Sequence, residues 1–208
     1  MTPNKSGLSS VEVERGIYID YEGNIDKAPT LLGWRVDGVN HAAIIEPAFA
    51  TCARRFRAKY VEFMEHSILA RQLLLQATAQ GRRVFSWSEH DLKLIHTVLS
   101  QDEQEQFTLL HKNAIKPARS WYWKKNKVVA PDGTLSFFCD NMGFSVPERF
   151  GVGIVGSGLR LIRSQLTAGR DYADLTPKAR SSWVNIVRHN RLDLEGMEHV
   201  LRATLTPP

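Results

Sequence analysis

Three short segments rich in β-branched, aliphatic and aromatic residues follow one another from residue 16, and they constrain the fold more than any other feature. They read GIYIDYEG (16–23), TLLGWRVDG (30–38) and HAAIIEP (41–47), with Gly-Asn and Asp-Gly turn signals at their junctions. Short strands joined by such turns pair with one another in antiparallel fashion. The sequence therefore predicts an antiparallel three-stranded meander near the start of the chain.

The rest of the chain is predicted to be mainly helical. Apolar residues recur at helical spacing over about 50–80, Gly81 is a stop signal, and RRVFSW (82–87) has the composition of a short strand. Ser88 is a candidate N-cap for the helix after that strand. We expect further helices over about 101–112, 134–142, 157–167 and 176–202, the last with a break near residue 189 left open. Residues 1–13 are expected to be flexible and 113–135 irregular, within one α/β domain.

The composition excludes several classes of protein. The chain has 208 residues, of which 43% are hydrophobic and 24% charged, which is typical of a globular domain with a packed core. No apolar run approaches the roughly 18 residues of a membrane-spanning helix, and the N-terminus lacks the apolar stretch of a secretory signal. We therefore expect a soluble, cytoplasmic protein in which Cys52 and Cys139 are small packed side chains.

Several acidic residues occupy positions that the predicted elements do not require. Asp20 and Glu22 lie inside the first predicted strand, where alternation puts both on one face and their like charges repel. Asp91 lies in the first turn of the helix after VFSW. Asp193 borders an apolar helical stripe, and His189 precedes it by one turn on the same face. Each position alone has an ordinary explanation: a strand end, helix-dipole complementation, a half-solvated helix border or a packed histidine.

Taken in this order, the residues resemble the DEDD exonucleases of the ribonuclease H-like superfamily. The similarity is greatest to the bacterial branch of predicted ribonuclease H-like nucleases whose last motif has a Tyr four residues before the Asp. The matching stretches are IYIDYEGN with TLLGWRVDG, VFSWSEHDLKLI, LSFFCDNMGF and IVRHNRLDLEGMEHVL, which extend from about residue 15 to 203. The resemblance implies a ribonuclease H-like fold over residues 14–206, with a mixed sheet that opens with the meander and is flanked by helices.

The resemblance also assigns roles to individual residues. The metal ligands would be Asp20, Glu22, Asp91 and Asp193. His189 departs from the family because it stands in the Tyr position, and Glu89 competes with Asp91 for the second motif. Four clustered carboxylates need cations to stay ionised, so we expect two Mg²⁺ or Mn²⁺ ions, and a histidine with an ordinary pKa of about 6.5 can act as general base. The implied reaction is two-metal hydrolysis of phosphodiester bonds from a 3′ end.

A basic and aromatic segment without acids, residues 111–130, predicts a surface for single-stranded DNA or RNA. Basic groups contact phosphates and aromatic rings stack on unpaired bases. The assigned residues are Lys112, Lys116, Arg119, Trp121, Trp123, Lys124, Lys125 and Lys127, with Arg160 and Arg163 from a second acid-free stretch at 149–170. The alternative is a solvated loop whose aromatic residues pack on the core. The net charge of +5 favours a polyanionic partner without requiring one.

Other interpretations of the sequence remain open beside the exonuclease. Residues 151–156 match the G-x-G-x-x-G fingerprint of dinucleotide-binding proteins, but no convincing strand precedes them, so we interpret them as a Gly-rich loop and expect no nucleotide cofactor. A catalytically inactive nucleic-acid-binding module and an endonuclease of the same superfamily are the two alternatives. No motif distinguishes DNA from RNA as substrate.

Overall fold

The computed structural model describes residues 8–23, 29–53, 61–147, 150 and 153–206. Its centre is a six-stranded sheet in the order β4-β3-β2-β1-β5-β6. The strands are β1 (Ile17–Glu22), β2 (Leu31–Val36), β3 (Val39–Ile44), β4 (Val61–Phe63), β5 (Val84–Ser86) and β6 (His111–Asn113). Strands β1, β2 and β3 pair in antiparallel fashion, whereas β1–β5, β5–β6 and β3–β4 are parallel pairs. The predicted meander and the mixed α/β sheet are thus confirmed.

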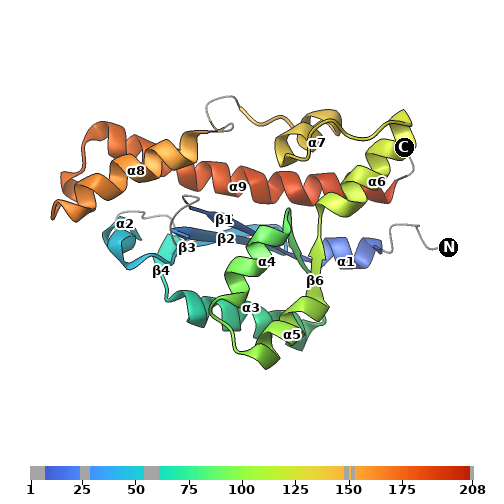
Figure 1. Ribbon diagram of the computed structural model, residues 1–208, viewed down its shortest axis with the longest axis horizontal. Coiled ribbons are helices and arrows are strands. Elements are labelled where there is room, and N and C mark those ends of the chain that lie inside the picture. Colours follow the sequence, from blue (N-terminus) through green and yellow to red (C-terminus); the bar gives the residue numbers. More distant parts are fainter. Residues whose placement is uncertain (1–7, 24–28, 54–60, 148–149, 151–152, 207–208) are drawn as a thin grey trace.

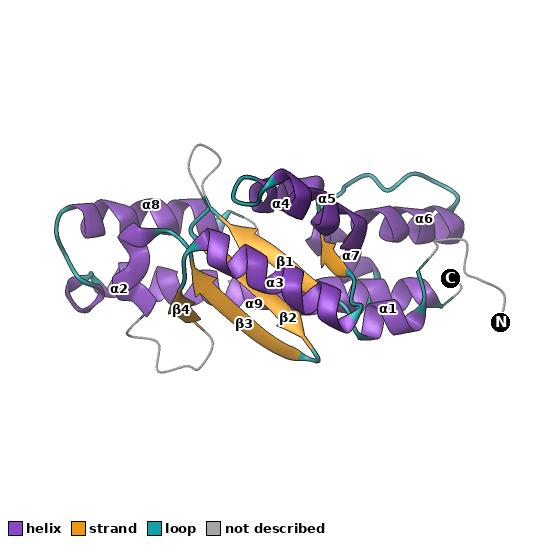
Figure 2. Cartoon of the chain, turned by 90° about the horizontal axis from the view of Figure 1, so that it is seen from below, coloured by secondary structure: helices purple, strands orange, loops and turns teal. Residues whose placement is uncertain are grey.

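Helices cover both faces of this sheet (Figure 1). They are α1 (Ser10–Glu14), α2 (Ala50–Ala53), α3 (His66–Gln80), α4 (Glu89–His96), α5 (Gln101–Leu110), α6 (Ile115–Asn126), α7 (Leu135–Asn141), α8 (Ile154–Thr167) and α9 (Pro177–Leu205), with 3-10 turns η1 (Pro47–Phe49) and η3 (Tyr172–Asp174). Helix α9 runs along one face, with α6, α7 and α8 on its outer side, and α3 and α5 lie on the opposite face. Seen from below, α3 crosses the strands of the meander (Figure 2).

Side-chain alternation along β1 decides which residues face α9. Ile17 and Ile19 pack in the core shared with α3, whereas Tyr18 packs in the core shared with α7 and α9. Since successive strand residues point to opposite faces, Asp20 and Glu22 continue the series of Tyr18 and face α9. The strand therefore presents its two acids to the longest helix of the molecule.

The turns and caps predicted from local sequence are present. Asp37 and Gly38 join β2 to β3 with φ values of 50° and 77°, as a two-residue hairpin of the Asp-Gly type requires. Gly81 ends α3 in the left-handed conformation. Ser88 caps α4, and Asp91 completes a capping box with it. None of the helices described in the structure is long and apolar enough to cross a membrane.

The prediction of one helix over 50–80 is wrong. Strand β4 lies between α2 and α3 and pairs with β3, while residues 54–60 fall outside the described part of the chain. Periodicity does not separate a three-residue strand from a helical segment, because only the distant partner strand defines it.

The structure also corrects other predictions about the helical part and answers one question left open. Residues 113–135 contain α6, since Lys, Arg and Trp are compatible with a helix and Pro117 lies in its first turn. Residues at the expected loose N-terminus form α1, which a capping box of Ser9 and Glu12 stabilises. Helix α9 continues without a break through His189. Helix α8 begins at Ile154, earlier than expected, and the described residues between α7 and α8 form no strand.

Candidate metal centre

Acidic residues from three elements meet at the carboxyl end of the two central parallel strands. Asp20 and Glu22 lie at the end of β1, and Asp91 lies in the first turn of α4, which follows the neighbouring strand β5. Asp193 and His189 lie near the middle of α9, which crosses this face. Ligands of open α/β sheets bind outside the carboxyl ends of the strands. The structure thus brings together the five residues that the sequence assigned to catalysis, and we call the four carboxylates among them the acidic cluster.

Glu22, His189 and Asp193 form the tightest group in this region. Nε2 of His189 lies 3.4 Å from Oδ2 of Asp193 and 3.8 Å from Oε1 of Glu22, and one ligand atom from each residue lies within 4.8 Å of the others. Glu22 is 7% exposed, and its buried Oε1 has no hydrogen-bond partner in the part of the chain that the structure describes. A buried polar atom without a partner is costly. A cation at this position would supply the missing interaction.

The backbone of Phe150 determines which nitrogen of His189 faces the carboxylates. Nδ1 of His189 lies 2.6 Å from the carbonyl oxygen of Phe150. A carbonyl only accepts hydrogen bonds, so Nδ1 carries the hydrogen that is donated. In the neutral ring, the lone pair of Nε2 therefore points toward Glu22 and Asp193. Metal-binding histidines are commonly oriented in this way.

Asn190, which the sequence interpretation missed, holds Asp20. Its Nδ2 donates to the backbone oxygen of Asp20 at 3.0 Å and to Oδ2 of Asp20 at 2.8 Å, and the residue is 1% exposed. Gly33 pairs with Asp20 across β1 and β2, and a Cβ atom at Gly33 would overlap the Asn190 amide. A glycine inside a predicted strand marks such a close approach, and this was the available signal.

Asp91, not Glu89, is the acid of α4 that belongs to the acidic cluster. Asp91 is buried, and its Oδ2 accepts hydrogen bonds from the backbone nitrogen and Oγ of Ser88, at 3.4 Å and 3.2 Å. Glu89 instead accepts from Nδ2 of Asn113 at 3.1 Å and pairs with Lys116 at 3.2 Å. The capping box therefore holds Asp91 beside β1 and leaves Glu89 on the outside.

Burial and mutual repulsion raise the pKa values of the acidic cluster. For Asp20, burial and then the charges of the other three carboxylates raise the pKa, against the hydrogen bond from Asn190. Burial, Asp193 and Asp91 raise the pKa of Glu22. Burial raises the pKa of Asp193 to about 6 against the effect of His189, and burial raises the pKa of Asp91 against its bonds to Ser88. Among the described residues, no Lys or Arg forms an ion pair with these four.

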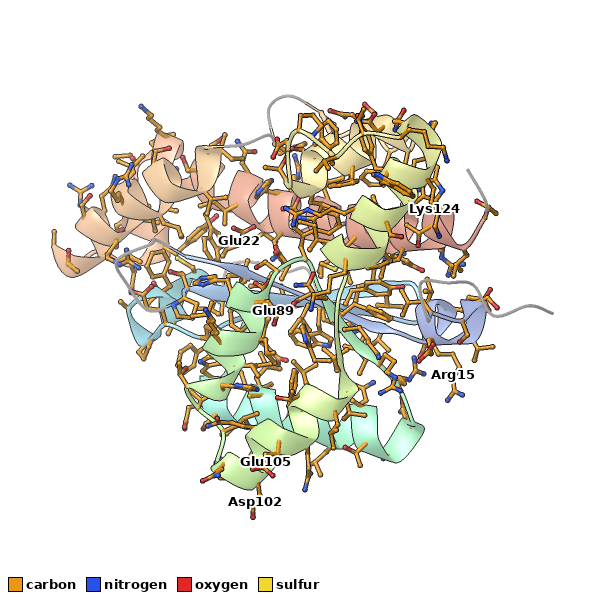
Figure 3. The ribbon with its side chains drawn as sticks, turned by 45° about the vertical axis from the view of Figure 1, so that its right-hand side comes forward. Arg15, Glu22, Glu89, Asp102, Glu105 and Lys124 are labelled. Carbon is orange, nitrogen blue, oxygen red and sulfur yellow. The ribbon has the colours of Figure 1, made fainter. Side chains whose placement is uncertain are left out.

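A cleft of about 650 Å³ opens over Glu22, His189 and Asp193. Its walls come from α4, from the segment around α7 and from the start of α8, and the described residues that line it include no Lys or Arg. Figure 3 shows Glu22 between α9 and the sheet, with Asp102 and Glu105 far from it beyond the opposite face. This volume suits a small-molecule or nucleotide ligand, and the lining is acidic.

The predicted nucleic-acid-binding residues of 111–130 lie on β6, on α6 and at its C-cap, Lys127. Lys116, near the start of α6, pairs with Glu89 of α4, whereas the end of α6 lies away from the acidic cluster. Nε1 of Trp121 donates to the backbone oxygen of Thr206 at 3.2 Å. The end of α6 thus lies beside the end of α9, roughly 20 Å along that helix from Asp193. Trp123 is 54% exposed, and Lys127 lies over its ring at 5.6 Å. In Figure 3, Lys124 lies toward the same end of α9.

The second predicted basic stretch does not form one surface. Arg160 is exposed on α8, but Arg163 is only 8% exposed. Its Nε and Nη2 donate to Glu46 at 3.0 Å and 2.6 Å, and Nη2 also contacts Oγ1 of Thr30 at 3.3 Å. Contrary to expectation, the Arg163 guanidinium joins α8 to the sheet and is not open to nucleic acid. Residues 149 and 151–152 of this stretch lie outside the described part of the chain.

Comparisons with known proteins add no relative to this description. The chain matches no protein-family model, no curated protein and no solved structure.

Proposed function

We propose that this protein is a metal-dependent nuclease that hydrolyses phosphodiester bonds, as a 3′–5′ exonuclease on single-stranded nucleic acid. The observation that carries the proposal is the buried Oε1 of Glu22, which has no hydrogen-bond partner among the described residues and faces the acidic cluster. Buried carboxylates in proteins are paired or bind metals. Oxygen ligands favour hard divalent cations such as Mg²⁺ and Mn²⁺.

The residues of the cluster fit such ions in different ways. Glu22 and Asp193 each offer a carboxylate oxygen close to Nε2 of His189. Asp20 accepts a hydrogen bond from Asn190 through Oδ2. Asp91 approaches from α4 and is the candidate for a second ion. When bound, two divalent cations would activate a water and stabilise the leaving oxygen of a phosphodiester. Without cations the acidic lining repels a phosphate, so we expect no activity in a chelator.

Two further observations support this function. The meander, the parallel strands β5 and β6 and the acids at the end of β1 agree with what the resemblance to ribonuclease H-like exonucleases implies. The end of α6 offers the exposed Trp123 among lysines. A nucleic-acid strand with its 3′ end in the cleft would need several nucleotides to reach Trp123 at the end of α6. We expect Trp123→Ala to weaken binding of single-stranded DNA by about 1–3 kcal/mol.

The decisive experiment is degradation of 5′-labelled single-stranded DNA and RNA with Mg²⁺, Mn²⁺ or EDTA. We expect a metal-dependent ladder that shortens from the 3′ end and is lost in Asp20→Asn. Asp102→Asn, the same change at an exposed position of α5, is the matched control and should retain activity. A blocked 3′ end separates exonuclease from endonuclease cleavage.

Two results would contradict parts of this proposal. Cleavage of the blocked substrate at internal positions would show an endonuclease with the same chemistry. Absence of cleavage with either metal, while the folded protein still binds single strands in a salt-sensitive way, would show a catalytically inactive binding module.

A further inference from the structure

We propose that His189 is itself a ligand of the metal ion held by Glu22 and Asp193, so that this position prefers a transition-metal ion such as Mn²⁺ to Mg²⁺. The inference rests on the proposed metal-dependent function and defines the ligand set and the class of ion more closely. It gives His189 a role different from that of a general base.

The distances between the three side chains carry the first step. Atoms that bind one ion at about 2.0–2.2 Å lie roughly 3–4 Å from each other. The distances from Nε2 of His189 to Asp193 and Glu22, 3.4 Å and 3.8 Å, lie in this range. Both exceed the roughly 2.7–2.9 Å of a charge-assisted hydrogen bond. The two distances from Nε2 are therefore those between ligands of one ion rather than those of hydrogen-bonded partners, and the third separation is within 4.8 Å.

The direction of the His189 lone pair carries the second step. The bond from Nδ1 to the Phe150 carbonyl leaves Nε2 of the neutral ring without a hydrogen. When both carboxyls are ionised, Nε2 presents a lone pair to oxygens that also carry only lone pairs, and one of these is the unpartnered Oε1 of Glu22. In this ionised state the arrangement is unfavourable unless a metal cation or a proton lies among the three atoms, and a metal ion satisfies all three at once.

The backbone keeps this geometry in place. His189 and Asp193 are one turn apart on the unbroken helix α9, so both side chains project from the same face. Glu22 projects toward them from the central strand. The Phe150 carbonyl fixes the ring as an outer-shell partner of a metal-bound histidine does.

The nitrogen ligand determines which ion is preferred. Imidazole suits borderline transition metals, whereas carboxylates and water suit Mg²⁺ as well as Mn²⁺. A site of three carboxylates would bind both ions through oxygen alone. A nitrogen from His189 therefore adds affinity for Mn²⁺ and adds little for Mg²⁺.

The test compares Mn²⁺ and Mg²⁺ binding to untagged wild type, His189→Gln and His199→Gln. His199 is the matched control because it also lies on α9, and its Nε2 contacts a backbone carbonyl, that of Met142, at 2.8 Å. We expect His189→Gln to raise the Kd for Mn²⁺ about 10–100-fold and the Kd for Mg²⁺ less than about threefold. His199→Gln should change neither.

Electron spin echo spectroscopy of bound Mn²⁺ gives a second readout that does not depend on a variant. Wild type should show the ¹⁴N coupling of a ligating imidazole, and His189→Gln should lose it. If His189→Gln does not fold, the wild-type spectrum alone decides. Mn²⁺ that binds without nitrogen coupling would overturn the inference and leave the metal-dependent nuclease standing. A folded wild type that binds neither ion would overturn both.

Discussion

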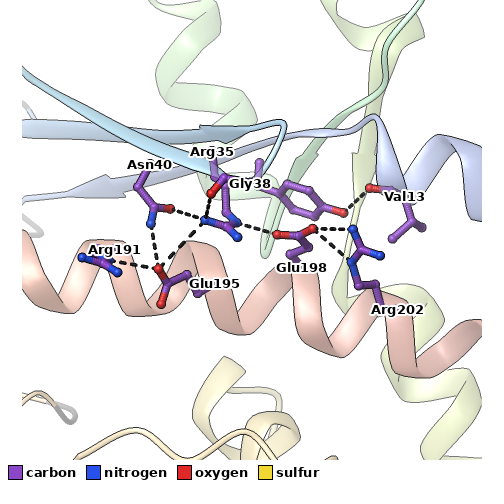
Figure 4. A network of polar contacts seen from close by, with 9 residues as sticks. Val13, Arg35, Gly38, Asn40, Arg191, Glu195, Glu198 and Arg202 are labelled. Carbon is purple, nitrogen blue, oxygen red and sulfur yellow. Dashed lines mark hydrogen bonds and ion pairs between the residues drawn. The ribbon is translucent and has the colours of Figure 1, made fainter. Parts of the chain in front are cut away.

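Helix α9 carries Asp193 of the acidic cluster and, two and five residues later, Glu195 and Glu198, and the surroundings of these carboxylates differ. Beyond the acidic cluster, Glu195 and Glu198 belong to a paired network with Arg35, Asn40, Arg191 and Arg202 (Figure 4). Nε of Arg35 lies 2.5 Å from Glu198, and Nη2 of Arg202 lies 2.8 Å from it. Among the described residues, the ion-pair partner of both Asp193 and Glu22 is His189.

The pKa values follow this difference in partners. Burial acts to raise the pKa of Glu198, but the hydrogen bonds from Arg35 and Arg202 outweigh it, and the pKa is lowered. Burial without such donors raises the pKa of Asp193 to about 6. Glu198, which holds α9 on the β2–β3 hairpin, is thus neutralised by hydrogen bonds from arginines. The acidic cluster has none in the described chain, and we infer that its neutralising charge comes from bound cations.

The largest expected effect comes from removing a carboxylate of the acidic cluster. Glu22→Gln should lower kcat/KM by more than about 100-fold, because even outer-shell changes at metal sites cost 10–100-fold. In EDTA its free energy of unfolding should stay equal or rise, because one of four repelling charges is removed. Nuclease kinetics and urea unfolding measure the two quantities. Glu105→Gln, an exposed change on α5, is the control. A variant that keeps activity but loses stability would place Glu22 among structural residues.

Breaking the paired network should lower the stability of the protein and leave metal binding nearly unchanged. Arg35→Ala leaves the buried Glu198 with fewer donors and should lower the free energy of unfolding by about 3 kcal/mol. The Kd for Mn²⁺ should change less than about threefold, since Arg35 does not contact the acidic cluster. Urea unfolding and calorimetric titration test both parts. Loss of metal binding in a folded Arg35→Ala protein would contradict the separation of the two groups.

Lowering the pH should change the free energy of unfolding in opposite directions through the acidic cluster and through the paired network. Asp193 has a folded-state pKa of about 6, above the roughly 3.9 of an unfolded Asp. The folded state therefore binds more protons between these values, so in EDTA the free energy of unfolding should rise by about 1 kcal/mol from pH 7 to about pH 5.

Glu198 contributes in the other direction and in another pH window. Its lowered pKa gives stability that is fully present above the roughly 4.3 of an unfolded Glu and is lost as the pH falls below that value through the lowered folded pKa. With saturating Mn²⁺, the free energy of unfolding should instead fall from pH 7 to pH 5, because protons compete with the metal for the acidic cluster. Urea titrations at each pH check these trends, and an unchanged stability in EDTA over this range would argue against the raised pKa of Asp193.

A smaller effect is expected from the amide that orients Asp20. Asn190→Ala should raise the Kd for Mn²⁺ about tenfold, as loss of an outer-shell partner does. Asn40→Ala is the comparison, because it removes an amide bonded to Glu195 in the paired network and should leave the Kd unchanged. Equal metal affinities in the two variants would show that Asn190 only packs α9 against Gly33.

The parts of the fold that depend on local sequence were predictable. The Asp37-Gly38 turn, the Ser88 cap, the alternation that puts Asp20 beside Glu22 and the one-turn spacing of His189 and Asp193 are all properties of neighbouring residues. They place each candidate residue on its own element, whereas the expectation that acids of separate elements meet came from the resemblance to the exonucleases.

The missed features depend on segments that meet only in the folded chain. Strand β4 exists through its pairing with β3, and the burial of Arg163 depends on Glu46 from a distant turn. The close approach of Asn190 to Gly33 and the Phe150 carbonyl that orients His189 are likewise tertiary contacts. No period or composition of a single segment specifies such contacts.

The central claim, that the acidic cluster is a divalent-cation site, is tested most directly by anomalous scattering from crystals grown with Mn²⁺ at neutral pH. We predict an anomalous peak about 2.2 Å from Oε1 of Glu22 and Oδ2 of Asp193. The same crystals should show the paired network without metal. A cleft without a peak, in which Glu22 and Asp193 share a proton in a direct hydrogen bond, would contradict the account.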